Sequence, residues 1–260
     1  MCKVLLLGIL LPLVVADCDS CESAGPVSPS EQPAWLEALK TARDASLSRV
    51  NYKGGVFDTP ELAWTQTSYI QPQMHPYDRF FYDPTLGYTV DKFLDDLKIR
   101  YGGVDSILMW PTYTNIGIDD RNQFDYFRCM PGGLGGVTNI TDQLKARGVR
   151  VLWPYNPWDL GTHREPLNDE ATFAKLLKQT HGDGFNGDTM GFVPRSFWES
   201  ATKADYPLAF EPEGGGTDDA LNWSTMGWGY WSYLGNAGPP RVDRRRARRE
   251  ACGQGQCLHR

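Results

Sequence analysis

Short apolar segments that each run into a polar or aromatic loop recur along this chain and constrain its fold more than any other feature. Four of them cover residues 104–110, 149–158, 182–190 and 207–213. The stretches between them have the spacing of amphipathic helices, for example residues 88–101 and 169–180. Apolar strands that alternate with helices favour a parallel sheet covered by helices. The sequence therefore predicts an α/β fold with its reactive loops at the carboxyl ends of the strands.

The pattern gives a definite order of elements. A long loop is expected from residue 111 to about 137, and its glycine-rich run 132–136 lacks the Lys-Ser/Thr pair of a phosphate-binding loop, which favours a flexible loop. Five strands are expected, whereas a closed (β/α)8 TIM barrel has eight. We therefore predict a TIM-barrel-like sheet with about five β/α units. The expected helices are 33–50, 88–101, 138–147, 169–180 and 194–203, and the expected strands are 63–71, 104–110, 149–153, 185–188 and 208–210.

The N-terminus has the pattern of an export signal. Lys3 supplies a positive start, residues 4–15 are apolar, and Val14 and Ala16 fit the small-residue positions before a cleavage site. The apolar run is too short to cross a bilayer as an ordinary helix. We expect a signal peptide over residues 1–16, a secreted or secretory-lumen location, and no stable membrane span after the signal is removed; the alternative is an uncleaved anchor.

Two sequons and five cysteines outside the signal fit an oxidising compartment. The sequons place candidate glycosylation sites at Asn139 and Asn222. Cys18 and Cys21 form a CxxC pair, but neither a second such pair nor a histidine cluster accompanies it, so a disulfide or local disorder is favoured over a zinc or redox role. The odd count leaves one thiol over in an oxidising environment.

Charge is distributed unevenly, which suggests three regions after the signal. Residues 239–260 hold seven Arg and two acids, so the remaining 19 basic and 30 acidic residues give 1–238 a charge near −11. A basic nucleic-acid patch and a disordered tail both fit residues 239–260, and we favour the tail because no nucleic-acid-binding fold accompanies it. We expect a flexible segment and helix over 17–50 and the partial barrel over 51–238.

Asp188 is the first candidate for chemistry. It follows a short apolar strand, and Gly184 and Gly187 allow the backbone to pass close to a ligand. A carboxylate in this position is suited to attack an anomeric carbon or to stabilise the positive charge that develops there. The alternative is a capping Asp at a strand-to-helix turn.

Glu211 and Glu213 form the second candidate group, at the end of the last expected strand. Two carboxylates whose environments separate their pKa values make an acid and a base. Because side chains alternate along a strand, both residues lie on the same side, and spacing does not choose between them. A solvated acidic loop is the alternative.

Aromatic and polar side chains crowd two of the strand-end loops. Sugars need polar partners for their hydroxyls and flat apolar walls for their C–H faces, and these loops offer both. A lone histidine is more often structural than catalytic, and tryptophan is mostly a core residue. The candidate sugar-binding residues are Trp110, Tyr113, Asn115, Trp153, Trp158, Asp159 and His163.

Over roughly residues 60–215 the chain resembles the barrel glycoside hydrolases related to α-galactosidases and α-glucosidases. Residues 105–110, 148–158 and 183–188 carry the resemblance. It implies a nucleophilic Asp at the end of the fourth strand, which is the place of Asp188, and retention through a covalent glycosyl intermediate. The acid/base Asp that these enzymes carry on the sixth strand has no match in this chain.

The sequence thus predicts a secreted glycoside hydrolase-like protein that retains configuration, with a carbohydrate as its partner and with Asp188 as nucleophile assisted by Glu211 or Glu213. Two alternatives are a non-catalytic carbohydrate-binding protein and an inactive truncated barrel. No metal, organic cofactor or nucleic acid is expected, because the chain has no HExxH, P-loop or GxSxG motif. The sequence does not indicate an oligomeric state.

Overall fold

The computed structural model describes residues 26, 28–112, 116–159, 163–214 and 216–228. Contacts divide the chain into two compact units, of which the second covers 46–231. In the first unit the described residues form a 3-10 turn, Pro29–Glu31, and most of helix α1, Gln32–Arg49, which has no buried residue. The expected signal 1–16, the basic tail 239–260 and four of the five cysteines outside the signal lie outside the described residues.

The second unit is built on a five-stranded sheet in which all strands are parallel. The strand order is β1-β4-β5-β6-β7, so each strand pairs with the next sheet strand along the chain. An order without a reversal is that of a β/α barrel rather than of a doubly wound sheet. The predicted fold class, a partial β/α barrel, is confirmed. Its strands are β1 (Gln73–Met74), β4 (Ser106–Met109), β5 (Arg150–Tyr155), β6 (Gly184–Gly187) and β7 (Ala209–Pro212).

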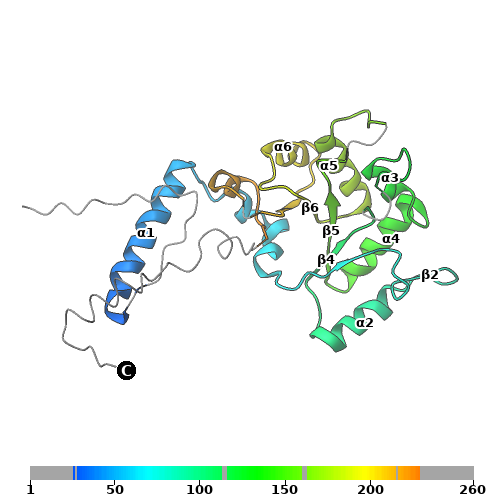
Figure 1. Ribbon diagram of the computed structural model, residues 1–260, viewed down its shortest axis with the longest axis horizontal. Coiled ribbons are helices and arrows are strands. Elements are labelled where there is room, and N and C mark those ends of the chain that lie inside the picture. Colours follow the sequence, from blue (N-terminus) through cyan, green and yellow to red (C-terminus); the bar gives the residue numbers. More distant parts are fainter. Residues whose placement is uncertain (1–25, 27, 113–115, 160–162, 215, 229–260) are drawn as a thin grey trace, which may run out of the picture. The chain divides into compact units, whose positions relative to one another are not determined.

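Five helices accompany these strands (Figure 1): α2 (Val90–Tyr101), α3 (Gln123–Arg128), α4 (Gly133–Ala146), α5 (Asp169–Thr180) and α6 (Arg195–Lys203). Their apolar faces form one buried core with alternate residues of the strands, in which Phe185 packs against Phe173 and Trp153 packs against Phe127. We call the face of the sheet that these helices cover the outer face. Strands β2 (Tyr82–Asp83) and β3 (Gly87–Tyr88) form a separate antiparallel hairpin. The described residues of this unit also form the 3-10 helices Gly55–Asp58, Pro60–Thr67 and Asp218–Asn222.

The first strand lies later than the pattern predicts. Residues 60–67 form a 3-10 helix that begins with Pro60, and pairing with β4 starts only at Ile70, whose carbonyl accepts from the amide of Asp105 at 3.0 Å. The apolar residue of this segment that the sequence pattern counted toward a strand, Trp64, packs instead against Leu108 and Leu152 from the opposite side of the sheet. We call that side the inner face.

The expected long loop to residue 137 is also wrong, because it contains α3 and the first turn of α4. Asn122 caps α3 by accepting from two backbone amides, and Asp125 returns the bond. The glycine-rich run belongs to a helix rather than to a flexible loop. A Cβ on Gly136 would meet the carbonyl oxygen of Pro131 at 2.2 Å, so glycine is required by the close turn that leads into α4.

The other helices and strands are close to their expected positions. Helix α5 begins and ends at the predicted residues, with Asn168 as its N-cap. Among the described residues, no helix is both long enough and apolar enough to cross a membrane.

Candidate functional site

The inner face of the sheet carries the candidate site. Parallel register sets Gln73 beside Leu108, Leu108 beside Leu152, and Asn186 beside Glu211. Side chains in one such row point to the same face of the sheet. Trp64, Met226 and Trp228 pack over the apolar part of this face, while its β6–β7 side is polar. A carboxylate on strand β7 is therefore held inside the sheet rather than in a solvated loop.

Glu211 is almost completely buried, with 5% of its surface exposed. Its Oε2 accepts from Gln71 Nε2 at 2.7 Å and from Asn186 Nδ2 at 3.1 Å. Burial raises the pKa of the Glu211 carboxyl, and hydrogen bonds from Gln71, Asn186 and Trp228 oppose that rise. A carboxylic acid whose pKa is raised by burial is the kind of group that serves as a general acid.

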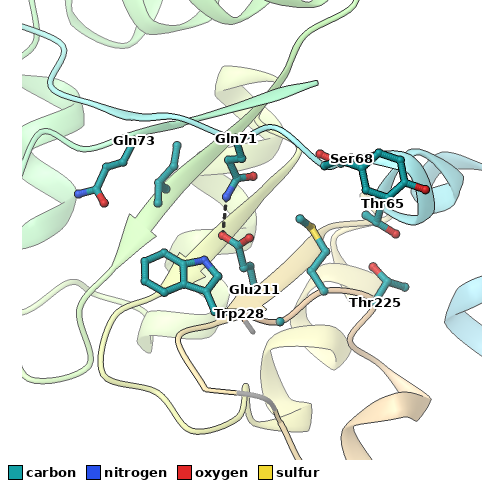
Figure 2. Close-up of a pocket in the computed structure, with 11 residues that line it drawn as sticks. Thr65, Ser68, Gln71, Gln73, Glu211, Thr225 and Trp228 are labelled. Carbon is teal, nitrogen blue, oxygen red and sulfur yellow. Dashed lines mark hydrogen bonds between the residues drawn. The ribbon is translucent and has the colours of Figure 1, made fainter. Parts of the chain in front are cut away.

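A cavity of about 780 Å³ opens beside Glu211. Figure 2 shows Gln71 pointing at Glu211 from one wall, with Trp228 close to the carboxyl group. Hydroxyl and amide groups dominate the rest of the lining, and among the described residues around it only Glu211 is an acid. The lining residues that matter here are Ser68, Tyr69, Gln71, Gln73, Glu211 and Trp228.

Asp188 lies directly after β6, at the carboxyl end of the sheet, and is 8% exposed. Its Oδ2 accepts from Asn156 Nδ2 at 2.8 Å and from the indole Nε1 of Trp158 at 3.2 Å. Trp158 is 44% exposed, so its ring offers an aromatic surface next to a buried carboxylate. The structure thus sets two of the predicted site residues, Asp188 and Trp158, side by side.

A second set of polar contacts fixes Asn156. Gln123 on α3 exchanges two hydrogen bonds with the Asn156 backbone, at 2.9 and 2.8 Å, and the Thr112 hydroxyl donates to Asn156 Oδ1 at 3.3 Å. Because its side-chain oxygen accepts from Thr112, the Asn156 amide nitrogen is left to face Asp188. The loops after β4 and β5 therefore orient the carboxylate that follows β6.

Glu213 holds the turn that follows Asp188. Its Oε2 accepts from the Thr189 amide at 2.5 Å, and its own amide donates to Gly187 at 3.1 Å. Thr189 has a φ of 59°, which is strained for a β-branched residue. Unlike Glu211, Glu213 does not line the cavity.

Register relates Asp188 to Glu211, although Asp188 does not line the cavity. Asn186 is the partner of Glu211, and Asp188 stands two residues after Asn186, just past the end of β6, on the same alternation. With strands about 4.8 Å apart and a rise of about 3.3 Å per residue, the two Cα atoms are separated by roughly 8 Å. Both carboxylates therefore belong to one edge of the inner face.

Trp153 does not belong to this edge, and its expected role in the sugar subsite is wrong. Its side chain is fully buried on the outer face, with its ring centroid 4.7 Å from that of Phe127. Trp110 is on the inner face with Leu108 and Leu152, but only 4% of it is exposed. The two tryptophans face opposite sides of the sheet. Leu152 lies in the row of Leu108, so Trp153, the next residue, points to the other face, because consecutive side chains of a strand alternate.

His163 and Asp159 both belong to the loop between β5 and α5. His163 Nδ1 is 3.0 Å from the Asp120 carbonyl and its Nε2 is 3.1 Å from Asp125 Oδ2. Asp159 is 9% exposed, and its amide donates to Asn156. The predicted Tyr113 and Asn115 lie outside the described residues.

His163 also takes part in a group of side chains with metal-ligand chemistry. One ligand atom from each of Asp125, His163 and Glu165 lies within 4.8 Å of the others. Arg128 already contacts both carboxylates, with a two-bond pair to Glu165 at 2.8 and 2.9 Å. A guanidinium in that position neutralises the charge a metal would need, so the arrangement fits an ion-pair network better than a metal site.

The candidate glycosylation sites differ in their surroundings. Asn139 is exposed on α4, with Thr141 of the same sequon fully buried. The Asn222 amide donates to the carbonyls of Val50 and Asp219, and the Ser224 hydroxyl donates to Phe210. Both groups of the second sequon are therefore used within the fold.

Sequence reasoning missed the partners that hold the two acids. Gln71 stands just before β1, where the strand was expected to end, and Trp228 lies beyond the last expected strand. Neither residue type marks a site by itself. A signal existed only for Asn156 and Asn186, each of which falls two residues from an acid or an aromatic residue at a strand end.

No family model matches this chain, and no curated protein matches its sequence. Among solved structures, it is similar to an α-amylase from Geobacillus thermoleovorans complexed with acarbose (16% identity, TM-score 0.36, 58% of this chain and 47% of that chain). It is also similar to a cyclomaltodextrinase, with 15% identity and a TM-score of 0.42 over 65% of this chain and 43% of that chain. The α-N-acetylgalactosaminidase NagBb from Bifidobacterium bifidum, in its GalNAc complex, is similar with 12% identity and a TM-score of 0.42 over 75% of this chain and 43% of that chain. The chain spans less than half the length of each, and similarity this weak carries no conclusion about activity.

Proposed function

We propose that this chain carries the catalytic edge of a glycoside hydrolase and that Asp188 and Glu211 share the chemistry. The observation that supports it is the placement of two buried carboxylates on neighbouring strands, at one edge of one face. One is beside an exposed indole and the other borders a cavity. Pairs of acids in different environments are the usual equipment for cleaving glycosidic bonds.

In the proposed reaction, Glu211 gives its proton to the oxygen of the leaving group as the bond from the anomeric carbon to that oxygen breaks. Asp188 attacks the anomeric carbon and forms a glycosyl ester. Water then attacks the same carbon, Glu211 takes the water proton, and the ester bond breaks to restore Asp188. Two inversions give net retention, as the resemblance to the α-galactosidase and α-glucosidase type implies.

Glu211 is preferred to Glu213 for the acid role. It lines the cavity, and burial raises its pKa. Glu213 holds the Thr189 turn instead. Trp158 is the proposed stacking surface, whereas Trp153 is dropped from the subsite.

The test is hydrolysis of a panel of aryl glycosides by the full 260-residue chain. Asp188→Asn should reduce kcat/KM by roughly a thousandfold or more on every substrate turned over, a typical cost of losing a catalytic group. Glu211→Gln should be severely slowed on glycosides with poor leaving groups but only mildly on dinitrophenyl glycosides, which depart without a proton. Exposed Asp219→Asn and Glu199→Gln are the matched controls.

The first-formed product, followed by proton NMR, should have the anomeric configuration of the substrate. Sugar binding without turnover, measured by calorimetry, would instead support the non-catalytic carbohydrate-binding protein. If the chain neither binds nor hydrolyses any glycoside of the panel, the proposal is wrong.

We also propose that the chain enters the secretory pathway with residues 1–16 removed. Expression in eukaryotic cells followed by mass spectrometry of the secreted chain tests this, with a new N-terminus at Asp17 as the expected result. Any glycan at Asn222 must be attached before folding, because the folded structure uses that amide and the Ser224 hydroxyl.

A further inference from the structure

A line of hydrogen bonds on the inner face leads from two serine hydroxyls to Glu211. Ser106 Oγ donates to Gln71 Oε1 at 2.7 Å, and Gln71 Nε2 donates to Glu211 Oε2 at 2.7 Å. Ser106 Oγ is also 3.0 Å from Ser68 Oγ. A hydroxyl has one hydrogen, so Ser106, having donated to Gln71, accepts from Ser68. The direction of every bond in the line is thereby set.

The Glu211 end of the line fixes which way the Gln71 amide is turned, because the serine hydroxyls can donate or accept. If the amide were reversed, its oxygen would face the Glu211 oxygen and its NH2 group would face the Ser106 hydroxyl. Two acceptors would then meet beside an ionised carboxylate, which is unfavourable in a buried place. Ser106 is fully buried, so no water replaces its bond to Gln71 Oε1.

Asn186 adds a second donor to the same carboxylate oxygen. Its Nδ2 donates to Glu211 Oε2 at 3.1 Å, and Asn186 is 1% exposed. A carboxylate oxygen has two lone pairs, and Oε2 uses both for N–H donors. A proton that binds Glu211 therefore binds the other oxygen, Oε1.

We propose that Gln71, held by Ser106 and Ser68, is a positioning residue that keeps the acidic proton of Glu211 on Oε1. Its role in turnover rests on the proposed function, but the proton placement does not. Figure 2 shows the contrast with Gln73, which lines the same cavity from the same strand segment yet points away from Glu211.

The direction of the hydrogen bond between Gln71 and Glu211 decides how the Glu211 pKa changes when Gln71 is removed. If Gln71 donates to Glu211, it stabilises the charged carboxylate, and removing it raises the pKa. If instead a protonated Glu211 donates to Gln71, the neutral acid is stabilised, and removing Gln71 lowers the pKa. Other ionisable side chains nearby are Tyr69 in the cavity wall, Asp188 two residues after Asn186, and Glu213 two residues after Glu211. They are unchanged in the variants below.

The experiment is a carboxyl ¹³C NMR titration of the full chain labelled at glutamate Cδ, with the Glu211 signal assigned by its loss in Glu211→Gln. Hydrogen bonds to a carboxylate lower its pKa by on the order of one unit each, so Gln71→Leu should shift the Glu211 pKa upward by about that amount. Gln73→Leu makes the same change of side chain in the same cavity and should leave the Glu211 pKa where it is.

A downward shift in Gln71→Leu would overturn the proposal, because it would place the proton on Oε2. An unchanged pKa would overturn it too. If Gln71→Leu does not fold, Ser106→Ala carries the test: it frees the Gln71 amide to turn, so the Glu211 pKa should rise by a smaller amount, and no rise counts against the proposal. Because the titration needs no substrate, an inactive chain with the expected shifts would refute the proposed function alone.

Discussion

Asn186 lies directly beside Glu211 in the β6–β7 register and donates a hydrogen bond to it at 3.1 Å. Both side chains are more than nine-tenths buried. The pair joins the strand that leads to Asp188 with the strand that carries the second acid. It is therefore the contact through which the two candidate catalytic carboxylates share one environment.

Asn186→Asp should be strongly destabilising at neutral pH, because two buried carboxylates in contact cannot both ionise. We expect a loss of about 3 kcal/mol in the free energy of unfolding at neutral pH, the usual cost of an uncompensated buried charge. The loss should shrink in acid, where both groups are protonated. Urea unfolding at both pH values measures it. Asn139→Asp, on the exposed face of α4, should stay close to the wild type at both.

Glu211 should make the stability of the chain depend on pH. Burial raises the pKa of Glu211 above its ordinary value of 4.5, so the folded chain holds the proton more tightly than the unfolded chain. The resulting stability is fully present below the unfolded pKa and is lost as pH rises through the folded pKa.

Glu211→Gln cannot ionise, and its stability relative to the wild type should therefore increase as pH rises from about 4 to about 8. Denaturant unfolding across this range gives the difference. Exposed Glu199→Gln should show a flat difference. A Glu211→Gln advantage that declines toward high pH would contradict the buried position of this carboxyl.

Two neighbouring glycines of α4 should respond in opposite directions to the same substitution. Gly136→Ala places a Cβ against the Pro131 carbonyl oxygen, whereas Gly135→Ala meets nothing within 4 Å. We expect Gly136→Ala to cost about 2 kcal/mol or more and Gly135→Ala to stabilise by about 0.5–1 kcal/mol through helix propensity. Thermal unfolding distinguishes them. Equal effects would mean that 132–136 is the flexible loop that composition suggests.

Trp153 and Trp158 should separate stability from binding. Trp153→Ala removes a fully buried ring and should cost about 3–5 kcal/mol. Trp158→Ala, at an exposed position, should cost about 1 kcal/mol or less but weaken sugar binding. Denaturant unfolding and ligand titration of both variants check this. Weakened sugar binding in a still-folded Trp153→Ala variant would restore that residue to the subsite.

Strands β4 to β7 and the position of Asp188 could be predicted from sequence, because these short segments alternate with regular helical patterns and are bounded by turn residues. Helix α5 was predictable to the residue, since Asn168 supplies a cap and the apolar spacing is regular. The first strand was not: Pro60 begins a 3-10 helix there, and the strand that follows has only two regular residues, Gln73–Met74. Helix α3 was missed because six residues give too little periodicity to stand out from a loop.

By itself, the sequence determined strands β4 to β7 and which acids stand at their ends. Only the tertiary structure decided which side chains face inward. Strands β4, β6 and β7 are buried along their whole length, so no alternation of apolar and polar residues marks a face. The helices cover the outer face, where Trp153 is buried, and Asn186 and Glu211 lie on the inner face. Which face the helices cover is decided by the packing of elements that are distant in the sequence, so no local sequence pattern predicts it.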